Sequence, residues 1–308
     1  MRIVLTGASG QLGAYLIDRL VAAGHDVSAW SGTEIGQRDG LALVPVDLTD
    51  AGATDRALAE ANPEVIVHAA AISRADVVFR NPDRGRAVNV GATARLADWS
   101  ARLGRRLVFI STDMVFDGSR PWNREDDPAE PILAYGRTKR DAEPAVLATP
   151  RGLVARISLL FGPSRSGRAS SFDRTLAALR GGQPQTFFRD EFRTPLDLAT
   201  AAEILVRLAE SDVSGLIHVA GHERVSRFDL VRRAASATGL DLSLVRANRQ
   251  SDVVLAEPRP ADISLDTSRQ AALFPDLRRP TIEEAMGAFG PLACETPARF
   301  PLDQTSPR

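Results

Sequence analysis

The sequence predicts an α/β fold with a doubly wound parallel sheet, joined to a smaller and less regular C-terminal α/β part. Over about the first 160 residues, short apolar runs alternate with helical stretches. These runs are apolar on both faces, which is typical of strands buried in a parallel sheet with right-handed crossovers. A glycine-rich segment follows the first run directly. In the later part the periodic signals weaken, and no clean linker or internal repeat separates the two parts.

The predicted elements of the first part follow one another closely. The first strand, at 2–6, is short and apolar, and the stretch at 11–23 carries apolar residues at helical spacing. Pro144 follows the segment 135–139 by little more than a turn, so we expect the helix that carries this segment to kink or end there. The remaining strands are expected at 25–30, 41–47, 64–70, 106–112 and 153–162, and the remaining helices near 50–61 and 82–103.

The second part is predicted in less detail. We expect a loop at 162–171, which is rich in Gly, Ser and Arg, and an irregular Pro-rich segment at 249–265. Helices are expected at 196–210 and 226–238, a strand at 215–221, and a frayed polar end at roughly 296–308. The first domain is therefore predicted to span 1–162 with contributions from about 191–221, and the second, interleaved with it, mainly 163–308.

Composition excludes several classes of protein. The chain has 308 residues, 44% of them hydrophobic and 25% charged, with a net charge of −1, which gives no support for nucleic-acid or anionic-membrane binding. The single cysteine, Cys294, excludes an intramolecular disulfide, and the four histidines form no metal-ligand spacing, so no metal is expected. The N-terminal apolar run breaks at Thr6-Gly7 and predicts a strand rather than a signal peptide, and no window resembles a transmembrane helix. We expect a cytoplasmic protein.

The glycine-rich segment GASGQLG stands between the first strand and the first helix, the position required of a dinucleotide-binding motif. Gly7 is expected to permit a tight turn, Gly10 to let the backbone approach a pyrophosphate, and Gly13 to let helix and strand pack closely. Amides at the helix N-terminus would then meet the phosphates. The segment predicts a Rossmann-type sheet and a cofactor site formed by Gly7, Ser9, Gly10, Gln11, Leu12 and Gly13.

The end of the second strand indicates the choice of cofactor. An acidic residue there would favour NAD, but the chain has Ser31 and, a little further on, Arg38. A hydroxyl and a nearby guanidinium suit a 2′-phosphate, so NADPH is favoured and NADH remains possible; Arg38 could equally be a solvated loop residue. Asp47 and Leu48, at the end of the third strand, could meet the adenine, or Asp47 or Thr49 could be a helix N-cap.

Lys139 is the only lysine in the chain and stands four residues after Tyr135, one of two tyrosines. On a helix this spacing puts a phenol and an ammonium on one face, one turn apart. A cation so close would stabilise phenolate and lower the tyrosine pKa from about 10 toward neutrality. The pair is therefore a candidate acid–base centre.

Five motifs in order carry a resemblance to a known group of proteins: GASGQLG, HAAA (68–71), VNV (88–90), STDMVFDG (111–118) and YGRTK (135–139). With these, the chain resembles the extended short-chain dehydrogenase/reductase superfamily. Within it, STDMVFDG and RPADISLDTSR (259–269) are similar to dTDP-4-dehydrorhamnose reductases, and about equally to the regulatory β subunit of methionine adenosyltransferase. The match runs from Met1 to about Phe274.

The resemblance implies roles for the residues near the predicted reaction centre. Tyr135 would protonate a carbonyl oxygen as hydride arrives from nicotinamide, Lys139 would hold the nicotinamide ribose, and Thr112 would hydrogen-bond the substrate oxygen. Asn89 would lie near the active site, with a structural role nearly as plausible. The cofactor-binding residues would also include Ala69, Ala70 and Ala71.

The resemblance also implies a substrate site in the C-terminal α/β part. Arg193 and Arg259 fall where sugar-nucleotide members hold the substrate diphosphate, a task that suits a guanidinium fork. Surface charge is the alternative for both. Asp113, Val115 and Phe116 would line the sugar pocket, although Phe116 could belong to the core.

The function implied is NADPH-dependent reduction of a 4-keto sugar nucleotide by a homodimer. One alternative is a non-catalytic NADP-binding regulatory subunit of a partner enzyme, which could keep the Tyr and Lys without catalysis. A second is a sugar-nucleotide epimerase. Dehydration is disfavoured because Met114 follows Asp113 where dehydratases of the superfamily carry an acidic pair.

Overall fold

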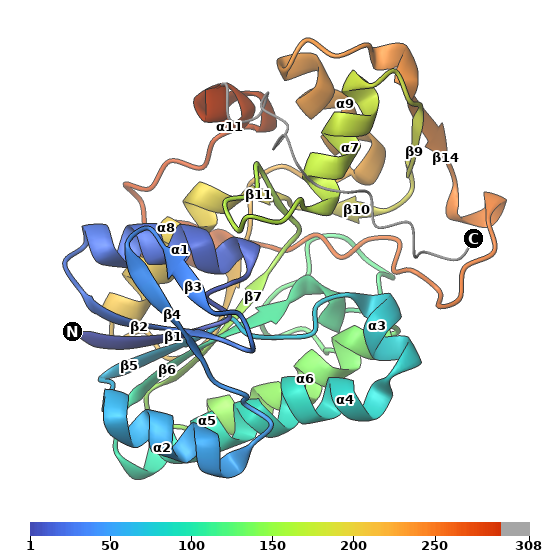
Figure 1. Ribbon diagram of the computed structural model, residues 1–308. Helices are drawn as coiled ribbons and strands as arrows, with labels where there is room; N and C mark the ends of the chain where they lie inside the picture. The colour runs from blue at the N-terminus through green and yellow to red at the C-terminus, as the bar shows by residue number, and fades with distance from the viewer. Residues whose placement is uncertain (291–308) are drawn as a thin grey trace.

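An eight-stranded sheet forms the centre of the computed structural model, which describes residues 1–290 (Figure 1). Seven strands run parallel, and only the short edge strand β3 is antiparallel to its neighbour β4. The strand order changes direction on either side of β1, which is where open α/β sheets bind ligands. In spatial order the strands are β12 (Gly215–Val219), β7 (Gly152–Ile157), β6 (Arg106–Thr112), β5 (Val65–His68), β1 (Arg2–Thr6), β2 (Asp26–Ser31), β4 (Leu41–Pro45) and β3 (Gly36–Arg38).

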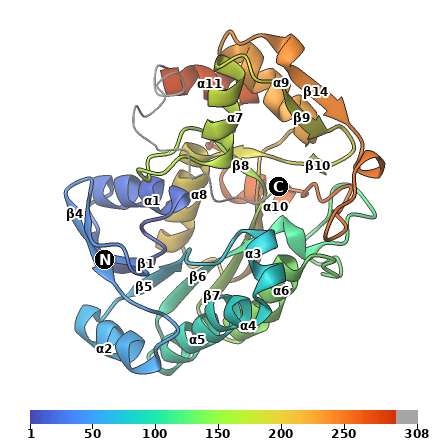
Figure 2. The ribbon, with the colours of Figure 1, turned by 45° about the vertical axis from the view of Figure 1, so that its right-hand side comes forward.

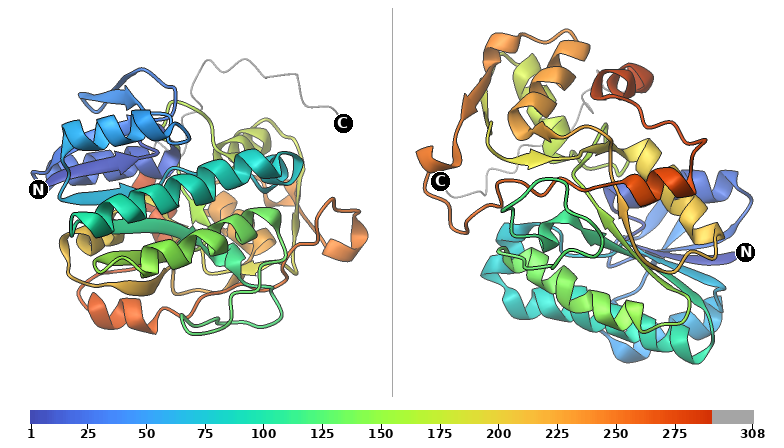
Figure 3. Two further views of the ribbon diagram at one scale, coloured as in Figure 1. Left: turned by 90° about the horizontal axis from the view of Figure 1, so that it is seen from below. Right: turned by 180° about the vertical axis from the view of Figure 1, so that it is seen from behind.

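Helices cover both faces of the sheet, so the predicted doubly wound fold is confirmed. Helices α1 (Gln11–Ala22) and α8 (Leu198–Glu210) pack on one face against Ile3 and Leu5, among others. The opposite face, which includes Val4, packs against α2 (Ala51–Ala61), α5 (Ala92–Arg102) and α6 (Ala134–Leu147). Figure 3 shows α5 and α6 lying across this second face. Alternate residues of a strand therefore belong to separate cores.

The second part lies beyond the carboxyl ends of the strands (Figure 2) and has a core of its own. Its helices are α7 (Ser171–Arg180), α9 (Arg227–Ala237) and α11 (Ile282–Phe289), and its paired strands are β9 (Gln185–Phe188) with β14 (Val245–Asn248) and β10 (Phe192–Arg193) with β13 (Val225–Ser226). Strands β8 (Leu160–Phe161) and β11 (Leu196–Asp197) pair with each other, and α10 (Ser268–Leu273) follows late in the chain.

Early and late segments of the sequence both contribute to the core between the sheet and helices α1 and α8. Leu196 and much of α8 and β12 pack with β1 and α1. This agrees with the expected contribution of about 191–221, while the domain boundaries themselves stay a prediction. Cys294 and the polar end at 296–308 lie outside the described residues.

Two long predicted elements are interrupted in the structure. The helix expected at 82–103 consists of α4 (Pro82–Arg86), one π-helical turn at Ala87–Gly91 and α5, with α3 (Ala75–Arg80) before it. The strand expected at 153–162 divides into β7 and β8. At this break the Ser158 amide bonds the Val219 carbonyl, and the Leu159 carbonyl accepts from the Leu196 amide, so the chain leaves the sheet for the second part.

The helix was expected to kink or end at Pro144, and it does not end there. Helix α6 continues to Leu147, and the Ala148 amide bonds the Pro144 carbonyl at 3.0 Å. Pro144 lies on the exposed side of the helix, while Glu143 and Val146 are buried beside it. The buried contacts of these neighbours offset the loss of one helical hydrogen bond.

Several short elements were not predicted. They include β3, β9, β10, β13, β14, α7, α10 and α11. The start of α7 has a readable signal, because Ser170 and Asp173 form a capping box. Within residues 1–290, no helix is long and apolar enough to cross a bilayer.

Candidate active site

The glycine-rich loop has the geometry that the sequence predicts. Gly7 has φ of +71°, and a Cβ there would lie 2.7 Å from the carbonyl carbon of Ala69. A Cβ on Gly13 would lie 2.2 Å from the Gly7 carbonyl oxygen, so helix α1 packs directly on the turn. No side chain caps α1 at its N-cap, Gly10. The loop and helix thus offer backbone amides to an anion.

The residues predicted at the adenosine end are held by their own partners. Ser31 is buried and its hydroxyl donates to the Glu34 carbonyl. Arg38 pairs with the Glu34 carboxylate at 3.2 Å and donates to the Arg165 carbonyl at 2.9 Å. Asp47 is exposed and accepts from the Thr49 amide and hydroxyl, which lowers the Asp47 pKa.

Neither Asp47 nor Thr49, the two N-cap candidates suggested by the sequence, is the N-cap of helix α2. Asp50 is the N-cap of α2 and accepts from the Ala53 amide at 3.0 Å. Leu48 is buried in the core under α2 and α5. An adenine contact of Asp47 stays a prediction.

Asn89 occupies the π-helical turn and is completely buried. Its side chain accepts from the Ile72 amide at 2.8 Å and donates to the Ile72 carbonyl at 3.1 Å. It also donates to the Thr138 hydroxyl at 2.9 Å, which in turn donates to the Tyr135 carbonyl at 2.8 Å. Asn89 therefore ties the chain just after Ala69, Ala70 and Ala71 to the helix that carries Tyr135 and Lys139.

His68 continues this chain of hydrogen bonds toward the glycine-rich loop. Its Nδ1 lies 2.7 Å from the Thr6 hydroxyl and its Nε2 lies 2.9 Å from the Thr93 hydroxyl. The Thr93 hydroxyl donates to the Asn89 carbonyl, so it accepts from Nε2–H, and Nδ1 accepts from Thr6. This assigns one neutral tautomer. Burial, with a smaller contribution from Lys139, lowers the pKa of His68 to about 3.

Tyr135 is buried, and the predicted lowering of its pKa is wrong for this structure. Burial raises the Tyr135 pKa above its ordinary value, and the Asp113 carboxylate acts in the same direction. A hydrogen bond with Thr112 acts in the opposite direction without reversing the shift. The cause overlooked is desolvation, which disfavours phenolate. At neutral pH Tyr135 carries its proton.

Lys139 is 1% exposed, and its Nζ lies 4.0 Å from the centre of the Phe109 ring. Burial lowers the Lys139 pKa to about 7, although the Glu143 carboxylate acts to raise it. An amine with this pKa can gain or lose its charge near neutral pH. A guanidinium cannot do so.

Glu143 and Arg156 are functional neighbours that the sequence analysis missed. Both are buried, and Arg156 donates two hydrogen bonds to Glu143, at 2.7 and 3.0 Å. Glu143 also accepts from the Ser111 hydroxyl at 2.6 Å. This group joins α6 to β6 and β7, so it fixes the height of Tyr135 and Lys139 over the sheet. The spacing of Glu143 one turn after Lys139 was the available signal.

Arg193 lies at the centre of a buried ion-paired group. It is 3% exposed and donates to Asp113 at 2.9 Å and to Glu191 at 3.2 Å. Asp113 also accepts from Ser158 at 2.9 Å and from Thr112 at 3.2 Å. Burial acts to lower the Arg193 pKa, but the two carboxylates outweigh it and raise the value. The predicted substrate ligands Arg193 and Asp113 are therefore committed to each other.

The second predicted arginine is in a different state. The Arg259 side chain is 44% exposed and lies 3.5 Å from Glu191, so most of its fork is free for a ligand. Arg227, which was not predicted, belongs to the same group of charges. Burial lowers the Arg227 pKa, and the positive charges of Arg193 and Arg259 lower it further. The Glu191 carboxylate acts to raise the Arg227 pKa without reversing the shift. Three guanidiniums face two carboxylates, Asp113 and Glu191, which leaves an excess of positive charge.

Val115 and Phe116 do not line an open pocket. Their exposed fractions are 0% and 1%, and both pack with Ile263 and Leu265. The alternative reading of Phe116 as core agrees with this packing.

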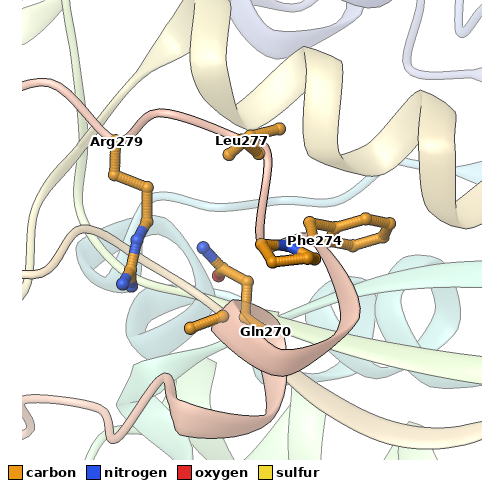
Figure 4. Close-up of a pocket in the computed structure, with 6 residues that line it drawn as sticks. Gln270, Phe274, Leu277 and Arg279 are labelled. Atoms are coloured by element: carbon orange, nitrogen blue, oxygen red, sulfur yellow. The ribbon is translucent and has the colours of Figure 1, made fainter.

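A small cavity lies beside α10, apart from the predicted site (Figure 4). Gln270 on its wall bonds both backbone groups of Ala220, and Arg279 donates to the Thr267 hydroxyl at 2.5 Å. The lining residues are Gln270, Ala271, Phe274, Pro275, Leu277 and Arg279. None of the predicted catalytic residues belongs to it, and we assign it no chemistry.

Comparison with known proteins agrees with the resemblance found in the sequence. Residues 1–289 match the family described as the RmlD substrate binding domain. The chain is 33% identical over 300 residues to methionine adenosyltransferase 2 subunit beta of Bos taurus, covering 94% of this chain and 88% of that protein. It is 33% identical over 297 residues to dTDP-4-dehydrorhamnose reductase of Mycolicibacterium smegmatis, covering 93% and 85%.

Among solved structures, the dTDP-4-dehydrorhamnose reductase from Bacillus anthracis in complex with NADP has a TM-score of 0.81 and 24% identity. The similarity covers 94% of this chain and 98% of that chain. It shows that the two proteins share one fold.

The neutral state of His68 predicts a pH dependence of stability. Between the ordinary pKa of 6.5 and the folded value of about 3, the unfolded chain binds a proton that the folded chain excludes. The free energy of unfolding should therefore fall as pH falls through this window, by up to about 1.4 kcal/mol per pH unit from this group. Urea unfolding should show a weaker acid dependence in His68→Gln. The exposed His222→Gln should behave like wild type, and equal slopes in all three proteins would contradict the assignment.

The different states of the two arginines predict different costs of removal. Arg193→Met leaves buried Asp113 without its cation and Glu191 with only the 3.5 Å contact to Arg259, so it should lower the free energy of unfolding by about 3–5 kcal/mol at pH 7. Arg259→Met, on the half-exposed neighbour of the same Glu191, should cost less than about 1 kcal/mol. Chemical denaturation measures both, and similar losses would show that Arg193 is not the structural member.

Proposed function

The chain belongs to the RmlD substrate binding domain family, and from this membership we propose that it reduces the keto group of a sugar nucleotide with NADPH. The substrate class follows from the dTDP-4-dehydrorhamnose reductase relatives, one of which is 33% identical over nearly the whole chain. A dTDP-4-dehydro-6-deoxy-L-sugar is the proposed substrate. A cytoplasmic homodimer remains a prediction.

The cofactor proposal rests on the glycine-rich loop and its surroundings. The Gly7 turn and the uncapped start of α1 suit a pyrophosphate, and Arg38 suits a 2′-phosphate. Ser9, Gln11 and Leu12 would complete the phosphate site, and Ala69 to Ala71 would lie along the cofactor. When bound, the nicotinamide supplies the hydride.

Tyr135 carries the chemistry in this proposal. A carbonyl carbon that accepts hydride leaves negative charge on its oxygen, and that oxygen needs a proton. Tyr135 keeps its proton at neutral pH because burial and Asp113 raise its pKa, so it can donate to the oxygen. The O–H bond of Tyr135 breaks as the new O–H bond of the product alcohol forms. The Thr112 hydroxyl, at the end of β6, would hold the carbonyl oxygen during transfer.

Lys139 has two tasks here. Its amine would hold the nicotinamide ribose, and its charge would stabilise the phenolate that Tyr135 becomes after proton donation. The pKa of about 7 would let the ammonium give a proton to Tyr135 afterwards, which restores the phenol, and the neutral amine would take up a proton from solvent once the product has left. The buried site excludes water that would compete for the proton.

The substrate diphosphate is proposed to meet Arg259 and Arg227. Arg259 is half exposed and weakly paired, and the surrounding group carries excess positive charge. Arg193 would act as a positioning residue, because it orients Asp113 beside Thr112 and Tyr135. The single observation that carries the reductase proposal is the buried Tyr135, beside Thr112 and one turn from Lys139.

Removing the tyrosine hydroxyl tests the mechanism. Tyr135→Phe should bind NADP⁺ as wild type does, because no cofactor contact is removed, and should lose at least about 100-fold in kcat. Oxidation of NADPH with dTDP-4-dehydrorhamnose, followed at 340 nm, measures the rate, and calorimetry measures cofactor binding. Turnover at the wild-type rate in this variant would remove Tyr135 from the mechanism.

Replacing the lysine by arginine tests why this position alone keeps a lysine. Lys139→Arg preserves the charge but puts a wider, permanently charged group into a site that is 1% exposed. Turnover should fall by at least about 100-fold. The same kinetic assay measures it, and a variant with near wild-type kcat would mean that charge alone suffices.

A second candidate function is supported by the other relatives. Methionine adenosyltransferase 2 subunit beta of Bos taurus is as similar to this chain as the reductase is, at 33% identity. The chain would then bind NADP and regulate a partner enzyme without turnover. Analytical ultracentrifugation with a methionine adenosyltransferase catalytic chain tests this candidate. A stable complex, with no NADPH oxidation by any 4-keto sugar nucleotide, would favour regulation over reduction.

A further inference from the structure

Three charged side chains meet next to the glycine-rich loop: Glu34 between β2 and β3, Arg38 in β3, and Arg168 from the segment after β8. The Glu34 carboxylate lies 3.2 Å from Arg38 through one oxygen and 3.4 Å from Arg168 through the other. Arg168 also donates to the Ser9 carbonyl at 2.9 Å. A single carboxylate thus bridges two guanidiniums at the edge of the dinucleotide-binding loop.

Arg168 comes from a segment that crosses to this site from the second part. The segment 163–168 follows β8 and is fastened to the first part at several points. The Tyr15 hydroxyl donates to the Pro163 carbonyl at 2.8 Å, and Arg38 donates to the Arg165 carbonyl at 2.9 Å. Arg165 lies 4.7 Å from the Tyr15 ring centre and pairs with Asp18 at 3.2 Å. These contacts hold the segment beside the loop whether or not Arg168 has a partner.

The three side chains lie between the glycine-rich loop and the segment that follows β2. In dinucleotide folds the ribose lies between the glycine-rich loop and the end of the second strand, and an arginine nearby accommodates a 2′-phosphate. Ser9 belongs to the loop, and Glu34 follows β2 by three residues. The glycine-rich loop therefore contacts Arg168 through the Ser9 carbonyl, and the segment after β2 contributes Glu34.

We propose that Arg38 and Arg168 form a two-arginine site for the 2′-phosphate of NADPH and that Glu34 occupies this site as a displaceable internal anion. The inference rests on the proposed binding of a nicotinamide dinucleotide and adds two residues to it, Arg168 and Glu34. A phosphate dianion can accept from both forks, whereas the carboxylate offers one oxygen to each. Within the part of the chain that the structure describes, Arg38 Nε is buried and has no hydrogen-bond partner, so a donor remains for a further acceptor oxygen.

Exposure is compatible with exchange of the anion. The side chains of Glu34 and Arg168 are 36% and 64% exposed, so the carboxylate can swing into solvent and the guanidinium can be reached. The Arg38 side chain is 10% exposed and stays fixed. A cofactor with a 2′-hydroxyl brings no charge to replace Glu34, so the site discriminates between the two nicotinamide cofactors.

Two nucleotides that lack nicotinamide isolate this site from catalysis. Isothermal titration of the full chain with adenosine 2′,5′-bisphosphate and with 5′-AMP measures the contribution of the 2′-phosphate alone. Arg168→Gln should weaken bisphosphate binding about tenfold, the value of one charge-assisted hydrogen bond, and leave 5′-AMP within about twofold. Glu34→Gln should tighten bisphosphate binding several-fold, because the competing anion is removed, and leave 5′-AMP unchanged.

The matched control is Arg165→Gln, which removes the same charge from the same segment but pairs with Asp18 instead of Glu34. It should leave the affinity for both nucleotides within about twofold of wild type. If Arg168→Gln and Arg165→Gln weaken bisphosphate binding equally, the proposal is overturned. Weaker 5′-AMP binding in Glu34→Gln would also overturn it, since Glu34 would then hold the ribose hydroxyls. Failure of wild type to bind either nucleotide would overturn this proposal together with the cofactor proposal. If wild type binds 5′-AMP but binds the bisphosphate no more tightly, only the present proposal is overturned.

Discussion

One chain of buried hydrogen bonds holds the candidate site together. It runs from Thr6, at the end of β1, through His68 and Thr93 to Asn89, and from the Asn89 side chain through Thr138 to the Tyr135 carbonyl. Each hydroxyl in this series of hydrogen bonds donates once, so the donors all point in one direction along it. This arrangement requires a neutral His68. The charge of Lys139 helps to keep the imidazole neutral. The glycine-rich loop and the helix with the proposed acid are thereby fixed to each other before any ligand binds.

The buried charges around these hydrogen bonds form ion pairs. These pairs also hold in place the elements that carry the residues proposed to react. Glu143 with Arg156 fixes α6 on the sheet, and Arg193 between Asp113 and Glu191 fixes the end of β6. Such pairs gain little stability in themselves, but they cost several kcal/mol to break. The ammonium of Lys139 is the exception, since burial brings its pKa to about 7. A group that can change its charge at neutral pH therefore lies where the proposed mechanism moves a proton.

Local patterns in the sequence predicted the first half of the fold closely. For the site, the sequence indicated which residues take part, but it did not indicate which side chains they contact. The strand at 2–6 follows from a short continuous apolar run, and the turn at Gly7 follows from sterics within a few residues. Pro144 was misjudged because its effect depends on which side of α6 faces the sheet. Arg193 was predicted as a diphosphate ligand from the resemblance, and its pairing with Asp113, 80 positions away in the chain, could not be read from the sequence. The raised pKa of Tyr135 likewise depends on burial, which the spacing of Tyr135 and Lys139 does not reveal.

The proposed reaction is reduction of a carbonyl with hydride from NADPH and a proton from Tyr135. Incubation of the full chain with dTDP-4-dehydrorhamnose and NADPH deuterated at the transferred position of nicotinamide, followed by mass spectrometry of the sugar nucleotide, tests it directly. We expect an alcohol that carries one deuterium on the former carbonyl carbon, and almost none of it with Tyr135→Phe. Unlabelled sugar nucleotide and unconsumed cofactor, in a protein that binds NADP⁺, would contradict the proposed reaction.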